Sequence, residues 1–410
     1  MWEQEIGVFP VSFKGQGDEW SYHVSTEISG HGHMAARGTD GTDPVELGPP
    51  PSGPVRSKLL VRPHADGASC TVAGEDEAAS PEQVDPWRRA AEAATSALGH
   101  RDRPFTWEAI VGTAPYSYGL DHLGALEAPQ GIGPVRLTPG GVCMREQIAS
   151  ERVDQGNGIR HSFPVIASGQ FSTYVWDRAA LAAELYLRRT CAMLSLFTGQ
   201  PWIPRSQPRQ LADSSERLRV PAVSGPMPPI AGLPDEPEWQ GQIPPDTRSF
   251  RLPVWVEQAW PLLEADEGLS RAVNAVYEAM RLERIHPSLA HLTFVAAIEG
   301  YGERFAEDVP CGCCPDCTQM KGAAQKRFRK ALKTVMSNRD TKEIAGLAYE
   351  LRSSTGHTGS LFGSEHTFGY SHHMRLFEVG SDVIFDYMVL GRLREASRLV
   401  LAMALGRSSP

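Results

Sequence analysis

The sequence has no long run of apolar residues, and no basic cluster precedes the first apolar segment, MWEQEIGVFPVSF. Spanning a bilayer takes about 20 mostly apolar residues, and a secretion signal begins with positive charge ahead of an apolar run. Neither pattern is present in the printed sequence. We therefore expect a cytoplasmic protein with no membrane contact.

Basic residues are fewer than acidic residues. The chain has 49 acidic and 40 basic residues and a formal net charge of −9. A nucleic-acid-binding protein usually shows a basic patch, so any contact with nucleic acid must come from a local one. Hydrophobic residues make up 41% and charged residues 22% of the chain, which is typical of a globular protein.

Cysteine is scarce outside one cluster. Of the seven cysteines, four fall within the seven consecutive residues CGCCPDC. An odd number concentrated in one place argues against the disulfide framework of a secreted protein. The other three are scattered and are expected to be ordinary buried thiols: Cys70, Cys143 and Cys191.

The pattern of the chain predicts an α+β fold, with a mixed amino-terminal region followed by an all-α bundle. Short β-branched and aromatic runs bounded by Gly, Pro, Asp and Ser predict strands at 57–63, 105–112, 133–139 and 170–176. Cap and stop signals predict two helices in the same region. One begins with Asp85 and Pro86 and stops at Gly99, and the other runs from Asp177 to Gly199.

A proline-rich segment divides the chain. Nine prolines lie between Pro221 and Pro253, and neither a helix nor a central strand can run through them. We therefore predict a sensing or docking region at 1–220, a connector at 221–250 and a helical domain at 251–410. The helical domain should hold four or five helices and no strand.

Cap and break signals place the helices of that domain. We expect interruptions at Pro261 and Gly268 and a helix start at Pro287. The last long helix should begin at Ser381 and stop at Gly406.

A shorter helix should precede the last one. Asp340 and Glu343 form a capping-box pattern, which predicts that this helix begins there. An apolar stripe follows at i, i+3, i+4 and i+7, made of Ile344, Leu347, Ala348 and Leu351.

Arg352 lies on the shoulder of that stripe, and His357 follows five residues later. The residues between them, SSTG, are poor helix formers, so the helix is expected to weaken before His357. If it continued, the two side chains would lie about 140° apart around its axis. The two side chains could act together if two copies of the helix met, so that Arg352 and His357 of both chains lined one groove.

The phrase YELRSSTGHTG resembles the Arg-x4-6-His motif of HEPN domains, most of all the Apea-like group. The resemblance covers roughly 252–405 and implies a dimeric, metal-independent endoribonuclease of a toxin, anti-phage or RNA-sensing system. It implies that Arg352 and His357 are catalytic at a composite dimer site, and that a regulatory or antitoxin partner restrains the enzyme. Histidine suits proton transfer at neutral pH, and arginine offers phosphate a fixed fork of donors.

Two other interpretations of the motif stay open. In the first, Arg352 caps the last carbonyls of its helix and His357 belongs to a loop. In the second, the domain is a non-catalytic, zinc-stabilised scaffold that binds RNA or protein. Ser353 favours the second interpretation, because the family commonly has Asn, Asp or His at that position. Tyr349, one turn ahead of Arg352, is a candidate phosphate contact or a core tyrosine.

The cysteine cluster predicts a structural metal site, with zinc ahead of iron–sulfur. Its ligands would be Cys311, Cys313, Cys314 and Cys317. Adjacent cysteines do not easily bind one ion, so His286 or His291 could complete the set, and a thiol cluster or redox switch is the alternative. No acidic or histidine triad accompanies the cluster, which argues against a catalytic metal.

A basic segment with no acid follows, TQMKGAAQKRFRKALKTVMSNR. It is either a solvated helix face or a wall that binds RNA phosphates. A DNA-binding regulator is a third possibility, but no recognition-helix pattern supports it. The candidate RNA-binding residues are Lys321, Lys326, Arg327, Arg329, Lys330 and Lys333, with Arg339 beyond them.

Overall fold

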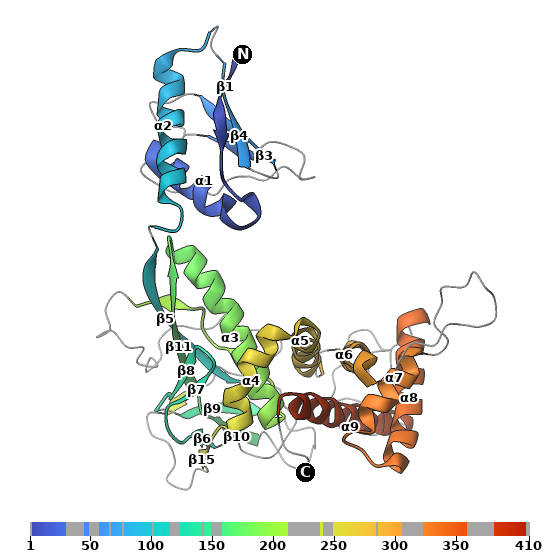
Figure 1. The fold of residues 1–410 in the computed structure, drawn as a ribbon. Helices are drawn as coiled ribbons and strands as arrows, with labels where there is room; N and C mark the ends of the chain where they lie inside the picture. Colours follow the sequence, from blue (N-terminus) through green and yellow to red (C-terminus); the bar gives the residue numbers. More distant parts are fainter. Residues whose placement is uncertain are drawn as a thin grey trace, which may run out of the picture. The chain divides into compact units, whose positions relative to one another are not determined.

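The protein has a mixed α+β fold, shown in Figure 1 as a computed structural model. Two compact units divide the chain: Met1–Pro104 with Ser172–Ala179, and Phe105–Phe171 with Ala180–Pro410. The division does not follow the predicted boundary at 220, because the strands of 105–171 group with the later helices. The structure describes residues 2–29, 45–48, 57–64, 67–75, 78–100, 102–114, 124–141, 143–148, 158–211, 238–240, 249–283, 286–305, 323–358 and 381–406.

The first unit is an antiparallel sheet packed against two helices (Figure 1). Its strands lie in the order β1-β4-β3-β2. Trp20 and Trp87 are fully buried in its core, and each indole N–H donates to a hydroxyl, that of Thr95 at 3.0 Å and that of Ser57 at 2.9 Å. The elements are β1 (Trp2–Phe9), α1 (Phe13–Ser29), β2 (Val45–Leu47), β3 (Lys58–His64), β4 (Gly67–Gly74) and α2 (Pro81–Ala97).

Helix α2 begins earlier than predicted. Ser80 is its N-cap residue and Pro81 its first residue, so the predicted start at Asp85 and Pro86 is wrong. Pro86 lies inside the helix, where it removes one backbone hydrogen bond. The buried stripe that includes Trp87 holds the helix together across this position.

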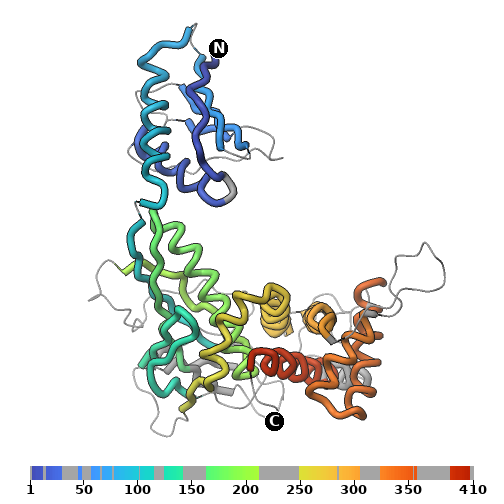
Figure 2. The backbone as a smooth tube through the Cα atoms, viewed as in Figure 1, coloured from blue at the N-terminus to red at the C-terminus, as the bar shows by residue number. Residues whose placement is uncertain are grey.

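The second unit combines a sheet with a set of helices (Figure 2). Its main sheet has the strand order β12-β5-β11-β8-β7, with β13 also paired to β5. The predicted strands at 105–112, 133–139 and 170–176 correspond to β5, β8 and part of β11. The strands are β5 (Arg103–Thr113), β6 (Ala125–Leu126), β7 (Gln130–Ile132), β8 (Val135–Pro139), β9 (Cys143–Ile148), β10 (Gly158–Ser162), β11 (Val165–Thr173), β12 (Trp202–Pro204), β13 (Arg209–Gln210), β14 (Glu238–Gln240) and β15 (Ser249–Phe250).

After Pro253 the residues that the structure describes form helices and no strand, as predicted, although there are more helices than expected. They are α4 (Val254–Ala265), α5 (Glu267–Leu282), α6 (Pro287–Tyr301), the 3-10 helix η1 (Gly302–Phe305), α7 (Ala323–Leu332), α8 (Asn338–Thr358) and α9 (Ser381–Ala404). None of the described helices is long and apolar enough to cross a membrane.

Helix α6 lies at the centre of this helical part. It contacts α5, α7, α8 and α9, and its residues are buried on most sides of its axis. A helix that is apolar all round needs such cover. It begins at Pro287, as predicted.

The predicted interruption at Pro261 is wrong, since α4 continues through it. The break before α5 comes at Asp266, whose carboxylate accepts the Leu269 N–H at 3.0 Å.

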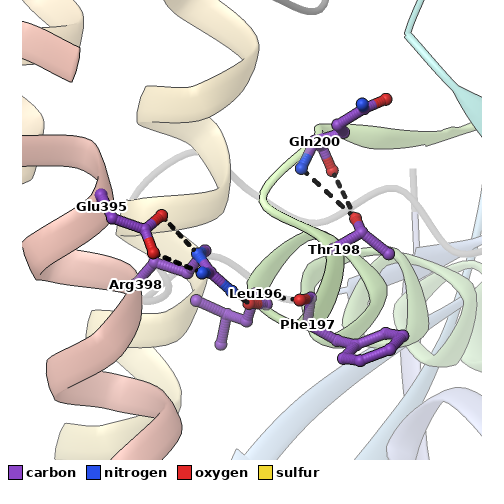
Figure 3. A network of polar contacts seen from close by, with 6 residues as sticks. All are labelled: Leu196, Phe197, Thr198, Gln200, Glu395 and Arg398. Carbon is purple, nitrogen blue, oxygen red and sulfur yellow. Dashed lines mark hydrogen bonds and ion pairs between the residues drawn. The ribbon is translucent and has the colours of Figure 1, made fainter. Parts of the chain in front are cut away.

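Arg398 of α9 satisfies the carboxyl end of α3 (Trp176–Thr198), as Figure 3 shows. Its Nη1 donates to the carbonyl oxygens of Leu196 at 2.7 Å and Phe197 at 3.0 Å, while its Nε donates to Glu395 at 2.8 Å. The last carbonyls of a helix lack partners within the helix, and a cation there also favours the helix dipole. Helix α3 then stops before Gly199, which has a φ of 74°.

We expect Arg398→Ala to lower the free energy of unfolding of the second unit by about 1–3 kcal/mol, because two charge-assisted hydrogen bonds to helix carbonyls are lost. Denaturant unfolding followed by circular dichroism measures the change. Arg392→Ala removes an exposed arginine of the same helix and should cost less than about 0.5 kcal/mol. Equal losses in the two variants would contradict the capping role.

Candidate functional site

Helix α8 carries both residues of the sequence motif, and Ser337 fixes its start. The Ser337 hydroxyl accepts the Asp340 N–H at 3.1 Å and donates to the Asp340 carboxylate at 2.6 Å. The predicted capping box of Asp340 and Glu343 is therefore displaced by three residues. Glu343 instead pairs with Arg339 at 3.2 Å.

The predicted weakening of this helix before His357 is wrong. Helix α8 runs through the SSTG sequence to Thr358, so His357 lies in its last turn. Gly356 faces Leu292 of α6, whose Cδ1 lies 3.8 Å from where a Cβ on the glycine would be. Helix α8 as a whole contacts α6, α7 and α9, and such tertiary contacts stabilise a helix more than the propensity of single residues does. On a continuous helix, Arg352 and His357 are about 140° apart around the axis.

The buried face of α8 is formed by Ile344, Ala345 and Ala348, while Leu347 and Leu351 are only half-buried. Arg352 lies at the edge of this face. Its Nη2 pairs with Glu299 Oε2 of α6 at 3.4 Å, and the two side chains are 27% and 13% exposed. Arg352 therefore binds a neighbouring helix and does not cap its own.

Tyr349 completes this contact. Its hydroxyl donates to Glu299 Oε1 at 3.3 Å, and the guanidinium of Arg352 lies 5.5 Å from the centre of its ring. Burial, and secondarily the charge of Glu299, raise the pKa of Tyr349 above its usual value. The phenol therefore stays protonated near neutral pH and can donate to the carboxylate.

His357 is exposed, and no residue that the structure describes makes a hydrogen bond or ion pair with its ring. It follows Glu350 by seven residues, so both lie on the solvent side of α8. The structure thus brings Arg352 together with Tyr349 and Glu299 but leaves His357 apart from them.

Four cations of the basic segment form one exposed face of α7 and the turn after it. Lys326, Arg329, Lys330 and Lys333 recur at i, i+3, i+4 and i+7, and we name them the cationic stripe. None of their side chains pairs with a residue in the described parts of the chain. Within the described ranges the stripe is therefore positive charge without an acidic partner, on a chain of net −9.

Arg327 differs from the stripe. Its side chain is 16% exposed and pairs with Glu303 of η1 at 3.1 Å. Gly302 allows this close packing, because a Cβ on it would lie 2.8 Å from the Arg327 carbonyl oxygen. Arg327 is therefore paired within the fold, and its predicted role in binding RNA stays a prediction. Lys321 lies outside the described residues.

The stripe and the Arg352–Glu299 pair face different ways. The opposite side of α7 buries Phe328, whose ring centre lies 6.3 Å from that of Tyr349. The cationic stripe is consequently turned away from Tyr349 and from the pair behind it. Within the described part of one chain, the predicted phosphate-binding cations and the motif do not share a cleft.

The predicted zinc ligands Cys311, Cys313, Cys314 and Cys317 lie outside the described residues. Elsewhere, the described residues contain no group of three or more His, Cys, Asp or Glu that could hold a metal. Of the scattered cysteines, Cys70 and Cys191 are buried thiols, as predicted, and burial raises the pKa of Cys70 to about 12. The side chain of Cys143 lies outside the described part.

His291 is fully buried in α6, and burial lowers its pKa from 6.5 to about 4. The unfolded chain binds the proton near its ordinary pKa, whereas the folded protein binds it only near the lowered one. Stability that is present above pH of about 6.5 is therefore lost as the pH falls to about 4, by up to about 3 kcal/mol.

His291→Gln should flatten this part of the pH dependence, whatever it does to stability at pH 7. Unfolding free energies of both proteins measured across the acid range test this. A slope unchanged by the substitution would show that other groups cause the loss.

Glu299 was not among the residues singled out from the sequence. Its partners lie more than fifty positions later, so no local pattern joins them. One signal was available: Glu299 is the sole acid in the helix PSLAHLTFVAAIEGY. A lone acid in an otherwise apolar, buried helix indicates a paired charge.

Comparisons with protein-family models, curated proteins and solved structures each find no match to this chain. The resemblance to HEPN domains therefore remains a prediction from the motif around Arg352 and His357.

Proposed function

We propose that the helical part of the second unit is a metal-independent endoribonuclease of a bacterial defence or toxin-type system. The observation that carries this proposal is the end of α8, where a half-buried arginine precedes an exposed histidine by five residues. The arginine would supply fixed positive charge and the histidine a group that can accept and donate a proton.

The proposed reaction is attack by the 2′-oxygen of RNA on the adjacent phosphorus. The P–O5′ bond breaks, and the products are a 2′,3′-cyclic phosphate and a 5′-hydroxyl. One proton leaves the 2′-hydroxyl and one reaches the 5′-oxygen, and His357 would take part in these transfers. Arg352 would stabilise the charge that develops on the phosphorane oxygens.

The placement of the two residues supports a site shared by two copies of the chain. Arg352 and His357 diverge on one helix, so we assign the working pair to Arg352 of one copy and His357 of the other. The side of α6 next to the α8 contact is free of charge, with Leu289 43% exposed and Ala296 and Gly300 exposed. Uncharged and small side chains there would allow two helical faces to approach closely.

A direct assay tests the function. Purified full-length protein incubated with labelled RNA in EDTA should produce fragments ending in 2′,3′-cyclic phosphate. Such an enzyme needs restraint, so a regulatory or antitoxin partner is part of the proposal, and the first unit is the proposed sensing or docking region. Cleavage that depends strictly on added Mg²⁺ would assign another chemistry.

The cationic stripe is the proposed surface that binds RNA phosphates. In a His357→Ala background, Lys326→Gln together with Lys330→Gln should weaken RNA binding several-fold. It should also reduce the slope of log K against log salt by about 1.4, since each cation on single-stranded RNA accounts for about 0.7. Titrations at several salt concentrations measure both. Lys342→Gln removes an exposed lysine of α8 outside the stripe and should change neither.

A second candidate is a non-catalytic scaffold that binds RNA or protein and is stabilised by zinc. The pairing of Arg352 with Glu299 favours it, because that charge is already used within the fold. Ser353, at a position where HEPN domains commonly have Asn, Asp or His, also favours the scaffold. RNA binding without cleavage, unaffected by His357→Ala, would select this candidate.

A further inference from the structure

Glu299 joins two residues of α8 to the central helix. Its carboxylate accepts from the Tyr349 hydroxyl at 3.3 Å and from Arg352 Nη2 at 3.4 Å, one oxygen serving each partner. The side chain is only 13% exposed. A carboxylate in such a place needs partners, and these two supply them.

The contacts with Glu299 and Tyr349 restrict the rotamers of the Arg352 side chain. Tyr349 precedes Arg352 by three residues, so the phenol and the guanidinium lie beside each other on α8, and the guanidinium carbon is 5.5 Å from the ring centre. An arginine in solvent samples many rotamers. Contact with a ring on one side and a carboxylate on another leaves far fewer.

The contact with Glu299 uses only one of the three nitrogens of the Arg352 guanidinium. Glu299 engages Nη2, and among the described residues nothing accepts a hydrogen bond from Nε or Nη1 of Arg352. Nε is itself buried, so Nη1 is the nitrogen that remains to meet a phosphate oxygen. Planar guanidinium groups bind phosphate best when they present two donors in a fixed direction.

We propose that Glu299 is a positioning residue, which holds the Arg352 guanidinium in the direction from which it meets the RNA phosphate. The proposal rests on the cleavage function proposed above. This role requires an acceptor oxygen at the distance that the length of the glutamate side chain provides. It depends less on the negative charge of that oxygen. A carboxamide of the same length can therefore replace the carboxylate, its oxygen accepting from Arg352 and its NH2 donating to the Tyr349 hydroxyl, and a shorter carboxylate cannot.

Three variants of Glu299 distinguish the effect of side-chain length from the effect of side-chain charge. Glu299→Gln should keep kcat within about 3-fold of the native value, while Glu299→Asp and Glu299→Ala should lower it about 10- to 100-fold, as a misplaced catalytic group does. KM for RNA should change by less than about 3-fold in all of them. If Asp is active and Gln is not, or if all three match the native chain, the proposal is wrong. If Glu299→Ala does not fold, the kcat of Glu299→Asp is compared with that of Glu299→Gln.

A second measurement does not need cleavage. The Nε–H resonance of Arg352, assigned by its loss in Arg352→Lys, should be rigid on the nanosecond timescale in the native chain and in Glu299→Gln. It should become mobile in Glu299→Asp and Glu299→Ala. An equally rigid signal in those two variants would overturn the proposal. A signal that behaves as expected in a protein that cuts no RNA would refute the cleavage function alone.

Glu283 provides the matched control. It is 9% exposed and pairs with Arg394 at 3.0 Å in the same unit, outside the motif. Glu283→Ala should lower the unfolding temperature as Glu299→Ala does, but should leave kcat per folded molecule and the Arg352 resonance unchanged. Equal losses of kcat in the two alanine variants would show that Glu299 acts only through stability.

Discussion

Replacing His357 by alanine is expected to slow RNA cleavage by about 10²- to 10⁴-fold, the usual contribution of a group that transfers protons in the transition state. The side chain is exposed in the last turn of α8, so the free energy of unfolding should change by less than about 0.5 kcal/mol. Initial rates on a labelled RNA and denaturant unfolding of the same samples measure the two effects.

A matched control is available in the first unit. His64 is also exposed, and its Nε2 lies 2.8 Å from the Ser69 hydroxyl, far from α8 in the sequence. His64→Ala should cleave RNA at the native rate. A His357→Ala protein as active as the His64→Ala protein would remove His357 from the reaction.

Arg352→Ala is expected to affect both activity and stability. Loss of a preorganised donor to the phosphorane should lower kcat by at least about 10²-fold. Unlike His357→Ala, it also leaves Glu299 largely buried without its cation, which should cost about 1–2 kcal/mol of unfolding free energy because the pair is only partly screened by solvent. Cleavage rates and unfolding curves on the same preparation separate the two losses.

Neutralising both partners resolves the ambiguity of the single variant. The double variant Arg352→Gln with Glu299→Gln leaves no unpaired charge, so it should recover most of the lost stability while remaining inactive. If this double variant cleaves RNA at the native rate, Arg352 is a structural residue and has no part in catalysis.

Helix boundaries that depend on one residue could be predicted from the sequence. Gly199 and Gly406 take up positive φ at helix ends, and Pro287 starts a helix, because the conformational preferences of Gly and Pro are local. Where packing decides, local signals failed. Helix α2 contains Pro86 and α4 contains Pro261, each held by a buried stripe that outweighs the lost backbone hydrogen bond.

The candidate site shows the same limit. The sequence places Arg352 and His357 on one segment and supplies the angle between them, but it predicted a helix break where α8 continues to Thr358. The partner of Arg352 lies 53 residues earlier in the chain, beyond the reach of any periodic pattern. Which cations of the stripe find an acidic partner likewise depends on which acids the fold brings near α7.

The shared site is tested most directly by combining two inactive chains. The Arg352→Gln, Glu299→Gln chain and the His357→Ala chain, carrying different tags and purified together as mixed oligomers, should regain roughly half of the native cleavage rate, because one of two composite sites is intact. Each chain alone should be inactive. A mixed oligomer no more active than either parent, alongside an active native protein, would contradict a site built from Arg352 of one copy and His357 of the other.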